Sequence, residues 1–507
     1  MAIQACSIRS SPLAAVIAIF LAGTFQTASA TDYFLTIGGG YSKAGNQASL
    51  EANVVFYQQL LTDKHRGPRR HDILFADGND PGADLQVLAD KPTKSIAPAT
   101  DLLAVLHRRN SEEKVTYRNH RVQPLVGALD PKLVRNQLDV LSKTMRTGDR
   151  MLVYVTAHGS EGPKDDRFNT TIDCWNNRKF TAREFTGWLD QLPTDVPVVM
   201  VMAQCYCGGF AHTIFNGLDE KKGLSPQLRV GFFAQQHNLP AAGCRPDVEH
   251  DEEFSSYFWG AMAGKTRNGV AIKGCDIDGN GSISFAEAYA HMVVAGETID
   301  IPLRSSEVLL RTYSRLTPEE ATDETRDGPE PPKLFTMTGS VESLLMHGGQ
   351  MSKHMATQLA KTLDVSLQDD VSAVTRGYDE SRRRAASRGR GRQSSGRRDL
   401  LKEVSEKYPE LGDEKKWAES SLLKAENQES LLAELQQLPS WKLFDERRQQ
   451  ATTADKEGDQ REIRSVKFRR LLNVLEGIVL EKNLPLVAAP EIVERYRLLV
   501  ALEKTGL

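Results

Sequence analysis

The chain has 507 residues, of which 40% are apolar, 26% charged and 7% aromatic, the composition of an ordinary globular protein with about two to four domains. Its 64 basic and 67 acidic side chains give a net charge of −3, which excludes a globally basic nucleic-acid binder and an acidic solvating tail. The one apolar run that approaches membrane length lies at the N-terminus, so a polytopic membrane protein is also excluded.

Residues 1–30 have the order of an export signal. Arg9 supplies a positive charge, an apolar stretch of about a dozen residues follows, and Ala28-Ser29-Ala30 forms an A-x-A cleavage site. The stretch is shorter than the ~20 residues that span a bilayer. We therefore predict a signal peptide cleaved near Ala30 and an exported mature chain, periplasmic or extracellular, without a transmembrane span. An uncleaved N-terminal anchor is the alternative.

From residue 31 to 315, short apolar segments alternate with amphipathic ones. Thr181 and Glu184 form the capping box of a helix, with Phe180 and Phe185 placed as its hydrophobic staple. Strands that are apolar on both faces and separated by helices specify a mostly parallel sheet with helices on both sides. We therefore predict an α/β domain over 31–315. Its strands are expected at 33–37, 72–76, 151–156, 196–203 and 229–234, with a sixth near 253–258, and its helices at 49–61, 131–145 and 210–216.

A different composition begins after residue 315. Residues 316–335 are acidic, rich in proline and without periodicity, which predicts a linker. Residues 336–507 are rich in Leu, Glu, Lys and Gln with helical periodicity, which predicts an all-helical C-terminal region. Within it, 380–398 carries eight arginines. A solvated flexible linker is expected there, and a contact with an anionic surface or a protease-sensitive loop are the alternatives.

Two of the predicted strands end in residues that can carry nucleophilic chemistry. The strand at 151–156 is followed by His158 and Gly159, and the strand at 196–203 by Cys205. If these strands are neighbours, imidazole and thiol meet at one edge of the sheet, about one or two strand spacings of ~4.8 Å apart. The imidazole can then deprotonate the thiol, and the amides of Gly159 and Cys205 can bind an oxyanion. Alternatively, Cys205 is a buried structural cysteine.

The order strand–His–Gly and then strand–Cys–x–x–Gly resembles the caspase-like cysteine peptidases, the group of legumain, metacaspases and caspases. The likeness covers 31–315, and TAHGS, AQCYCGGF and the loop GGGYSKAGNQAS are similar to the legumain-like side. The resemblance implies a caspase-like, mostly parallel six-stranded sheet, a catalytic dyad of Cys205 and His158, and oxyanion donors at Gly159 and Cys205. It also implies a thiol endopeptidase with a thioester intermediate and no cofactor for catalysis.

Two departures from this pattern bear on specificity. Ala203 stands where legumain and metacaspases place an acid. Gly45-Asn46-Gln47 lacks the arginine that legumain carries in the loop after its first strand. No preference for Asn, Asp or Arg is therefore transferred to this chain.

The expected mature chain has five cysteines, an odd number for an oxidising compartment. Cys207 lies two residues from Cys205, and a bridge between them would be strained and would block the thiol. Cys244 and Cys275 could pair, but sequence does not fix the connectivity, and Cys174 remains. No closely spaced Cys or His pair predicts a zinc site.

Residues 276–287 fit the twelve-residue EF-hand loop, in which Gly281 makes the sharp turn. A helix is expected to leave the loop at 288–295, whereas the entering segment at 270–275 looks extended. We predict a structural Ca²⁺ site, with an Asx-rich turn that binds no metal as the alternative. Its ligands would be Asp276, Asp278, Asn280, the carbonyl of Ser282, Ser284 through water, and Glu287 with two oxygens.

Together these features predict an exported cysteine endopeptidase that acts on peptide or protein substrates and carries a structural calcium loop. A transpeptidase is a rival, because a thioester can pass to an amine. A catalytically silent, calcium-dependent interaction module on the same fold is another, since the pocket acid is missing. The C-terminal helices would cap the cleft, as legumain's helical pro-region does, or bind a partner. No specific binding of nucleic acid is expected.

Overall fold

The computed structural model describes residues 30–88, 97–107, 115–244, 253–317, 332–386 and 394–507. The predicted signal peptide and most of the predicted linker at 316–335 lie outside these residues. Within the described chain, no helix is both long and apolar enough to cross a membrane.

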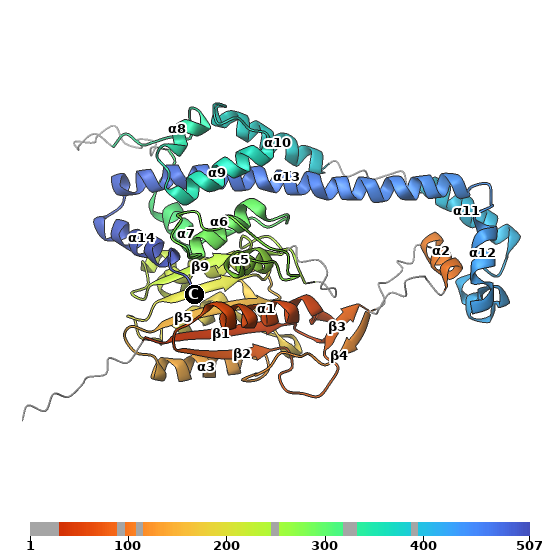
Figure 1. Cartoon of the computed structure of the whole chain (residues 1–507), viewed down its shortest axis with the longest axis horizontal. Helices are drawn as coiled ribbons and strands as arrows, with labels where there is room; N and C mark the ends of the chain where they lie inside the picture. The colour runs from red at the N-terminus through yellow and green to blue at the C-terminus, as the bar shows by residue number, and fades with distance from the viewer. Residues whose placement is uncertain (1–29, 89–96, 108–114, 245–252, 318–331, 387–393) are drawn as a thin grey trace, which may run out of the picture.

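The centre of the molecule is a six-stranded sheet with the strand order β10-β9-β8-β5-β1-β2 (Figure 1). Five strands run parallel, and β10 pairs antiparallel with β9 at one edge. The prediction of an α/β fold with a mostly parallel six-stranded sheet is therefore confirmed. The strands are β1 (Asp32–Gly39), β2 (Arg69–Phe75), β5 (Arg150–Ala157), β8 (Val198–Met202), β9 (Arg229–Phe233) and β10 (Leu303–Arg304). Two hairpins lie outside this sheet, β3 (Leu85–Leu88) with β4 (Val115–Arg118) and β6 (Thr171–Cys174) with β7 (Arg178–Thr181).

The sixth strand is not where the sequence predicts it. Residues 253–258 lead into a helix, α5 (Phe254–Ala263), and β10 takes the sixth place. Phe254 and Phe258 stack one helical turn apart with ring centroids 5.6 Å from each other, a pairing that a helix permits and a strand does not. Gly264 ends the helix at φ +75°, a left-handed cap that glycine adopts without strain. The helix predicted at 210–216 is present as a 3-10 helix that starts and ends earlier, η3 (Cys207–Ile214).

The handedness of the crossovers explains which helices cover which face. The connection from β1 to β2 moves one way across the sheet, and the path from β2 through β5 to β8 moves the other way. Right-handed crossovers therefore place α1 on one face and both α3 and α4 on the other. The contacts agree, because α1 packs on β1, β5 and α5, whereas α3 packs on α4. Helices α5, α6 and α7 follow β9 in the chain. The bounds are α1 (Ala48–Lys64), α3 (Pro131–Thr144), α4 (Ala182–Leu189), α6 (Phe285–Ala295) and α7 (Ser305–Tyr313).

The predicted capping box and staple form at the start of α4. The Thr181 hydroxyl accepts from the Glu184 N–H at 3.2 Å, and the Glu184 carboxylate accepts from the Thr181 N–H at 2.8 Å. Phe180 and Phe185 are both fully buried, with ring centroids 5.9 Å apart. Because Thr181 and Phe180 belong to β7, these contacts fix the β6–β7 hairpin to α4.

The C-terminal region is helical, as the sequence predicts. Its longest helix, α13, has 47 residues and is therefore about 70 Å long. It runs across the upper part of the molecule in Figure 1, below α8 and α10, and packs on α7, α9 and α10. The helices are α8 (Val341–Leu345), α9 (Gln350–Leu363), α10 (Val371–Ala386), α11 (Ser394–Lys407), α12 (Gln428–Leu435), α13 (Trp441–Val487) and α14 (Pro490–Glu503).

The arginine-rich segment at 380–398 is not a linker throughout. Helix α10 extends into it as far as Ala386, and α11 begins at Ser394. Arginine and alanine favour helix, which explains why the charge run at 382–386 continues α10 instead of ending it. Residues 387–393 lie outside the described chain.

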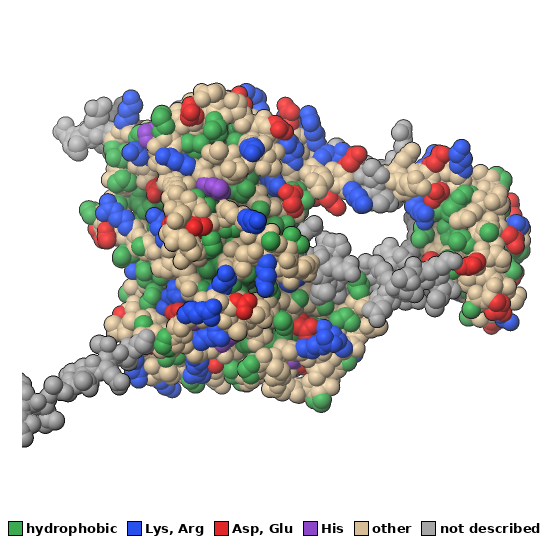
Figure 2. Space-filling model, viewed as in Figure 1, with side chains coloured by type: hydrophobic (Ala, Val, Ile, Leu, Met, Phe, Trp, Pro, Cys, Tyr) green, Lys and Arg blue, Asp and Glu red, His purple; other side chains and the backbone are tan. Residues whose placement is uncertain are grey.

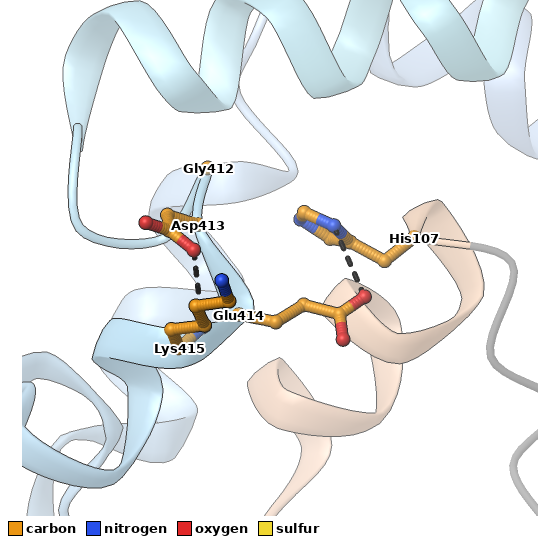
Figure 3. A pocket seen from close by; sticks show the side chains of 5 residues that line it. All are labelled: His107, Gly412, Asp413, Glu414 and Lys415. Atoms are coloured by element: carbon orange, nitrogen blue, oxygen red, sulfur yellow. Dashed lines mark hydrogen bonds and ion pairs between the residues drawn. The ribbon is translucent and has the colours of Figure 1, made fainter.

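An insertion of the sheet domain meets the far end of the C-terminal region. Helix α2 (Pro98–Leu106) lies between β3 and β4 in the chain but packs on α11 and α12 (Figure 1). Gln428 Oε1 accepts the N–H groups of Ala99 and Thr100 at 3.1 Å each, so α12 caps the first turn of α2. Beyond the other end of α2, His107 Nδ1 lies 3.4 Å from Glu414 Oε1 at an open pocket (Figure 3). Figure 2 shows this end standing apart from the body of the molecule, with basic and acidic side chains interspersed over the visible face.

A buried arginine fixes α13 to the sheet domain. Arg470 is 2% exposed and donates five hydrogen bonds of 2.7 to 3.2 Å into the end of α6 and the loop that follows it. The acceptors are the backbone carbonyls of Val293, Gly296, Thr298 and Asp300 and the hydroxyl of Thr298. The conformation of residues 293–300 therefore depends on the C-terminal region.

Candidate active site

The His-Gly and Cys motifs follow neighbouring parallel strands, β5 and β8. In this pair Val155 lies beside Met202, and all paired residues are 47 positions apart in the chain. His158 and Cys205 are also 47 positions apart, three residues beyond that last pair. The register therefore brings both residues to the same level of the carboxyl rim, where each is partly exposed.

His158 is held by the loop that follows β1. Its Nε2 lies 2.8 Å from the carbonyl oxygen of Gly45 and 3.0 Å from Gln47 Oε1. Gln47 Nε2 donates to the carbonyl of Ala44, which turns Oε1 toward the ring. Because both neighbours of Nε2 are acceptors, this nitrogen carries the proton of the neutral ring, and Nδ1 keeps its lone pair. Tyr41 packs edge-on against the imidazole at 5.1 Å. The ring is thus oriented with Nδ1 as its basic nitrogen.

Cys205 begins a tight turn out of β8. The next residue, Tyr206, is left-handed at φ +60°, a conformation that is uncommon without glycine and is found at strained functional turns. The sulfur accepts from the N–H of Ala241 at 3.3 Å and donates to the carbonyl of the same residue at 3.8 Å. Between the two described side chains of His158 and Cys205 there is no hydrogen bond. The structure thus brings the predicted dyad to one rim, with the thiol engaged by Ala241.

The two predicted oxyanion donors lie where the motifs touch. A Cβ at Gly159 would lie 2.4 Å from the carbonyl oxygen of Cys205 and 2.8 Å from that of Thr171. Only glycine lets the chain pass this close. Among the described residues, the N–H groups of Gly159 and Cys205 have no backbone acceptor, and the N–H of Cys205 interacts with its own sulfur. Both amides are therefore available to an oxygen that enters the site.

Burial sets the charge state of the two side chains. It lowers the pKa of His158 below the ordinary 6.5, against the hydrogen bond to Gly45 and the negative charge of Asp173. It raises the pKa of the Cys205 thiol above the ordinary 9.0, while the hydrogen bond from Ala241 lowers it. Both directions favour the uncharged forms. The resting site therefore holds a neutral thiol and a neutral imidazole.

Asp173 in β6 is a site residue that the sequence analysis missed. Its N–H donates to the carbonyl of His158 at 2.9 Å. Its carboxylate accepts from the hydroxyls of Ser160 and Thr171 at 2.8 Å each, and its charge raises the pKa of His158. The four-residue strand that carries it is short and partly polar, so neither its period nor its length distinguishes it from a loop.

The loop at 241–242, which contacts the thiol of Cys205, is connected to helix α13. The N–H of Ala242 donates to Asp300 Oδ1 at 2.8 Å, and the carbonyl of Asp300 is an acceptor of Arg470. Asp300 is fully buried, which raises the pKa of its carboxyl to about 6. Arg470 thus acts on the residues that engage Cys205 through one intermediate, Asp300.

All five cysteines of the described chain are free thiols. The Cys244–Cys275 bridge that the sequence allows is not formed, and neither is a bridge between Cys205 and Cys207. Cys174, Cys207 and Cys275 are buried, which leaves Cys205 and Cys244 as the partly exposed thiols of the described chain.

The six predicted calcium ligands lie around one loop. Oxygens of Asp276, Asp278 and Glu287 come within 4.8 Å of one another. The side chain of Asn280 donates to Asp278 at 2.9 Å and accepts from the N–H of Ser282 at 2.8 Å. Because the atoms that would ligate a metal ion are all oxygens, this set of residues fits a hard cation.

The ends of this loop are fixed on both sides. Ser284 caps the first turn of α6 and shares a capping box with Glu287, which is fully buried. The N–H of Phe285 donates to the carbonyl of Thr505, and Gln350 Nε2 donates to the carbonyl of Ile277, at 2.8 Å each. As expected, a helix leaves the loop and the entering residues 265–275 are not helical. The loop therefore links the sheet domain to the C-terminal region.

Comparisons with known proteins add little to this description. No protein-family model matches the chain, and no curated protein matches it. Among solved structures, a crystal structure of protein GSU0716 from Geobacter sulfurreducens is similar over 54% of this chain and 92% of its own, at 9% identity and a TM-score of 0.31. A likeness of this degree carries no argument about function.

Proposed function

We propose that this chain is an exported cysteine-type endopeptidase of the caspase-like group, with Cys205 as the nucleophile and His158 as the base. The proposal rests on the register of β5 and β8, which puts His158-Gly159 and Cys205 at one level of the sheet rim. The orientation of the imidazole, with Nδ1 as its basic nitrogen, supports it. So do the amides of Gly159 and Cys205, which have no backbone acceptor in the described chain. Export depends on the predicted leader at 1–30.

The reaction begins from the uncharged pair. Nδ1 of His158 takes the thiol proton while Sγ of Cys205 attacks the carbonyl carbon of the peptide. The amides of Gly159 and Cys205 donate hydrogen bonds to the carbonyl oxygen and stabilise the negative charge that develops on it. The imidazolium returns its proton to the leaving amine, and a thioester remains on the sulfur. Water, with its proton taken by His158, then hydrolyses the thioester. Substrate must first displace Ala241 from the sulfur.

We assign a structural Ca²⁺ to the loop at 276–287. Its oxygen donors and three converging carboxylates support this assignment. Bound Ca²⁺ would offset the repulsion between those carboxylates and stabilise the junction between α6 and the C-terminal residues. No step of peptide hydrolysis passes through this ion.

The test of the peptidase is alkylation combined with hydrolysis. Iodoacetamide should label Cys205 in the wild-type protein, and peptide mapping separates this thiol from the partly exposed Cys244. Hydrolysis of a positional-scanning peptide library should be lost in Cys205→Ala and His158→Ala and kept in the control Cys244→Ser. Unchanged hydrolysis in Cys205→Ala would exclude thiol catalysis by this residue.

One pair of observations favours a second candidate, a silent calcium-dependent interaction module. The sulfur is already engaged by Ala241, and Ala203 leaves the pocket without its acid. This candidate predicts no hydrolysis and no thioester in the wild-type protein, with or without calcium. The same library assay therefore separates the two.

A further inference from the structure

A second cluster of metal-ligating side chains lies on the same rim of the sheet, beyond β2. Asp77 lies two residues after β2, Asp84 directly before β3, and His120 two residues after β4. Each offers a ligand atom, and these atoms all lie within 4.8 Å of one another. The fold thus brings His120 to two aspartates that precede it by 43 and 36 positions in the chain.

The cluster is buried and has unpartnered atoms. The side chains of His120 and Asp77 are 2% and 6% exposed, and Asp84 is 2% exposed. Asp77 Oδ1 is buried without a hydrogen-bond partner and points at His120, with 3.6 Å to its Nε2. Nδ1 of His120 is likewise buried and unpartnered. Buried polar atoms are normally paired, so the unpartnered oxygen of Asp77, buried beside the imidazole of His120 and close to Asp84, points to a ligand in this cluster.

The remaining atoms of the three side chains are held as metal ligands usually are. Nε2 of His120 lies 2.7 Å from the carbonyl of Gly78, so this nitrogen carries the proton and Nδ1 keeps the lone pair. Asp84 accepts from the N–H of His120 and from Nδ2 of Asn46, at 3.0 Å each. Hydrogen bonds of this kind orient a ligating imidazole and a ligating carboxylate.

The charge of the cluster also calls for a cation. Two carboxylates lie together in a buried place, and within the described chain no lysine or arginine forms an ion pair with Asp77 or Asp84. Two unpaired buried carboxylates cannot both stay ionised at low cost. A divalent ion neutralises both, whereas a shared proton neutralises one.

We propose that Asp77, Asp84 and His120 bind a divalent transition-metal ion, with Zn²⁺ as the ion that fits best. An imidazole nitrogen beside carboxylate oxygens favours Zn²⁺ or a similar ion over Ca²⁺ and Mg²⁺, which take oxygen ligands. Three protein ligands leave a fourth position for water. The site is independent of the peptidase proposal. A metal ion at this site would also restrain the loop after β1. The side chain of Asn46 donates a hydrogen bond to Asp84, and the neighbouring residue Gly45 accepts the hydrogen bond of His158.

The test uses the full chain with Cys205→Ala, so that Zn²⁺ cannot bind the dyad, and with Ca²⁺ saturating the loop at 276–287. After chelation and dialysis, titration calorimetry with Zn²⁺ should give one equivalent bound, and the melting temperature should rise. Asp77→Asn and His120→Gln should each weaken binding by more than about 10-fold. The matched control Asp80→Asn, at an exposed acid of the same turn, should bind as the parent does.

X-ray absorption of the zinc-loaded parent gives a second readout that needs no variant. It should report one imidazole with oxygen ligands and no sulfur. Sulfur in the ligand set, absence of binding, or full binding in Asp77→Asn would each overturn the proposal. Absence of binding together with a melting temperature raised by Asp77→Asn would identify the cluster as a carboxyl pair that shares a proton.

Discussion

Replacement of Arg470 by methionine tests how strongly helix α13 stabilises the rest of the fold. Methionine fills much of the volume of arginine but donates no hydrogen bond, so five bonds to four residues are lost. Removal of one member of a buried charged network costs about 3–5 kcal/mol, because the former acceptors stay buried and unpaired. Part of this cost is offset, since the guanidinium no longer has to be desolvated. We expect a loss of about 3 kcal/mol in the free energy of unfolding.

The measurement is thermal unfolding followed by calorimetry, with Arg469→Met as the matched control. Arg469 is the neighbouring residue of α13, is 29% exposed and pairs with Glu476 at 3.7 Å. A pair of this kind contributes about 0–1 kcal/mol, so the control should melt close to the wild type. The Arg470→Met protein should melt about 3 °C lower, because the entropy of unfolding of a chain of this size is about 1 kcal/mol per kelvin. Equal melting temperatures for the two variants would refute the view that Arg470 supports residues 293–300.

The same variant reports on the thiol. Without Arg470, Asp300 loses a neighbouring positive charge that lowers its pKa, and the loop from 298 to 300 loses its support. Asp300 holds Ala242, and Ala241 engages the sulfur. We therefore expect Cys205 to react faster with iodoacetamide in Arg470→Met than in Arg469→Met. Equal alkylation rates in the two variants, at a temperature where both are folded, would refute the view that α13 affects the reactivity of Cys205.

Three further predictions concern the rim and the calcium loop. Burial lowers the pKa of His158, so the base form persists below pH 6.5 and the acid limb of the pH profile of kcat/KM lies below that value. The charge of Asp173 raises this pKa, so in Asp173→Asn the acid limb should move to still lower pH. A shift to higher pH would contradict the assignment of His158 as the base. Chelation of calcium should lower the melting temperature of the wild type and leave that of Glu287→Gln, already reduced, nearly unchanged; equal sensitivity would place the ion elsewhere. Gly159→Ala should abolish hydrolysis and destabilise the protein, because its Cβ would lie 2.4 Å from a backbone oxygen. The control Gly187→Ala, in open space on α4, should gain about 0.5–1 kcal/mol, and a harmless Gly159→Ala would show that the motifs do not meet.

The parts of the fold that the sequence predicts correctly are those with a local signal. β5 and β8 are recognisable because residues 151–157 and 198–202 are buried throughout and, apart from Thr156, apolar, as central parallel strands require. The segment at 253–258 misleads because aromatic residues favour strands, whereas in the structure it packs as a helix on α6 and α1, with Phe254 against Phe258. β10 has two residues and gives no periodic signal.

The site divides along the same line. His158, Gly159 and Cys205 can be found because each directly follows an apolar strand. Asp77 and His120 cannot be found in this way, because 43 positions separate them in the chain. Only the folding of the segment between β2 and the end of β4 brings them together. Ligands that converge through topology leave no spacing pattern, in contrast to the loop at 276–287, where all six positions fall within one turn of chain.

The position of the C-terminal helices indicates that they affect the candidate site through the core of the sheet domain, and not by covering the cysteine. A detachable cap has its own core and meets its partner domain through a modest interface. Here one apolar cluster runs from Phe232 in β9 through Tyr289 in α6 to Leu359 in α9 and Leu475 in α13. Loss of the C-terminal region would expose that core, so its removal would unfold residues 285–300 before it uncovered any cleft. The influence of α13 on the thiol therefore passes through Asp300 and the loop at 241–242, and does not require that a helix lie over the cysteine.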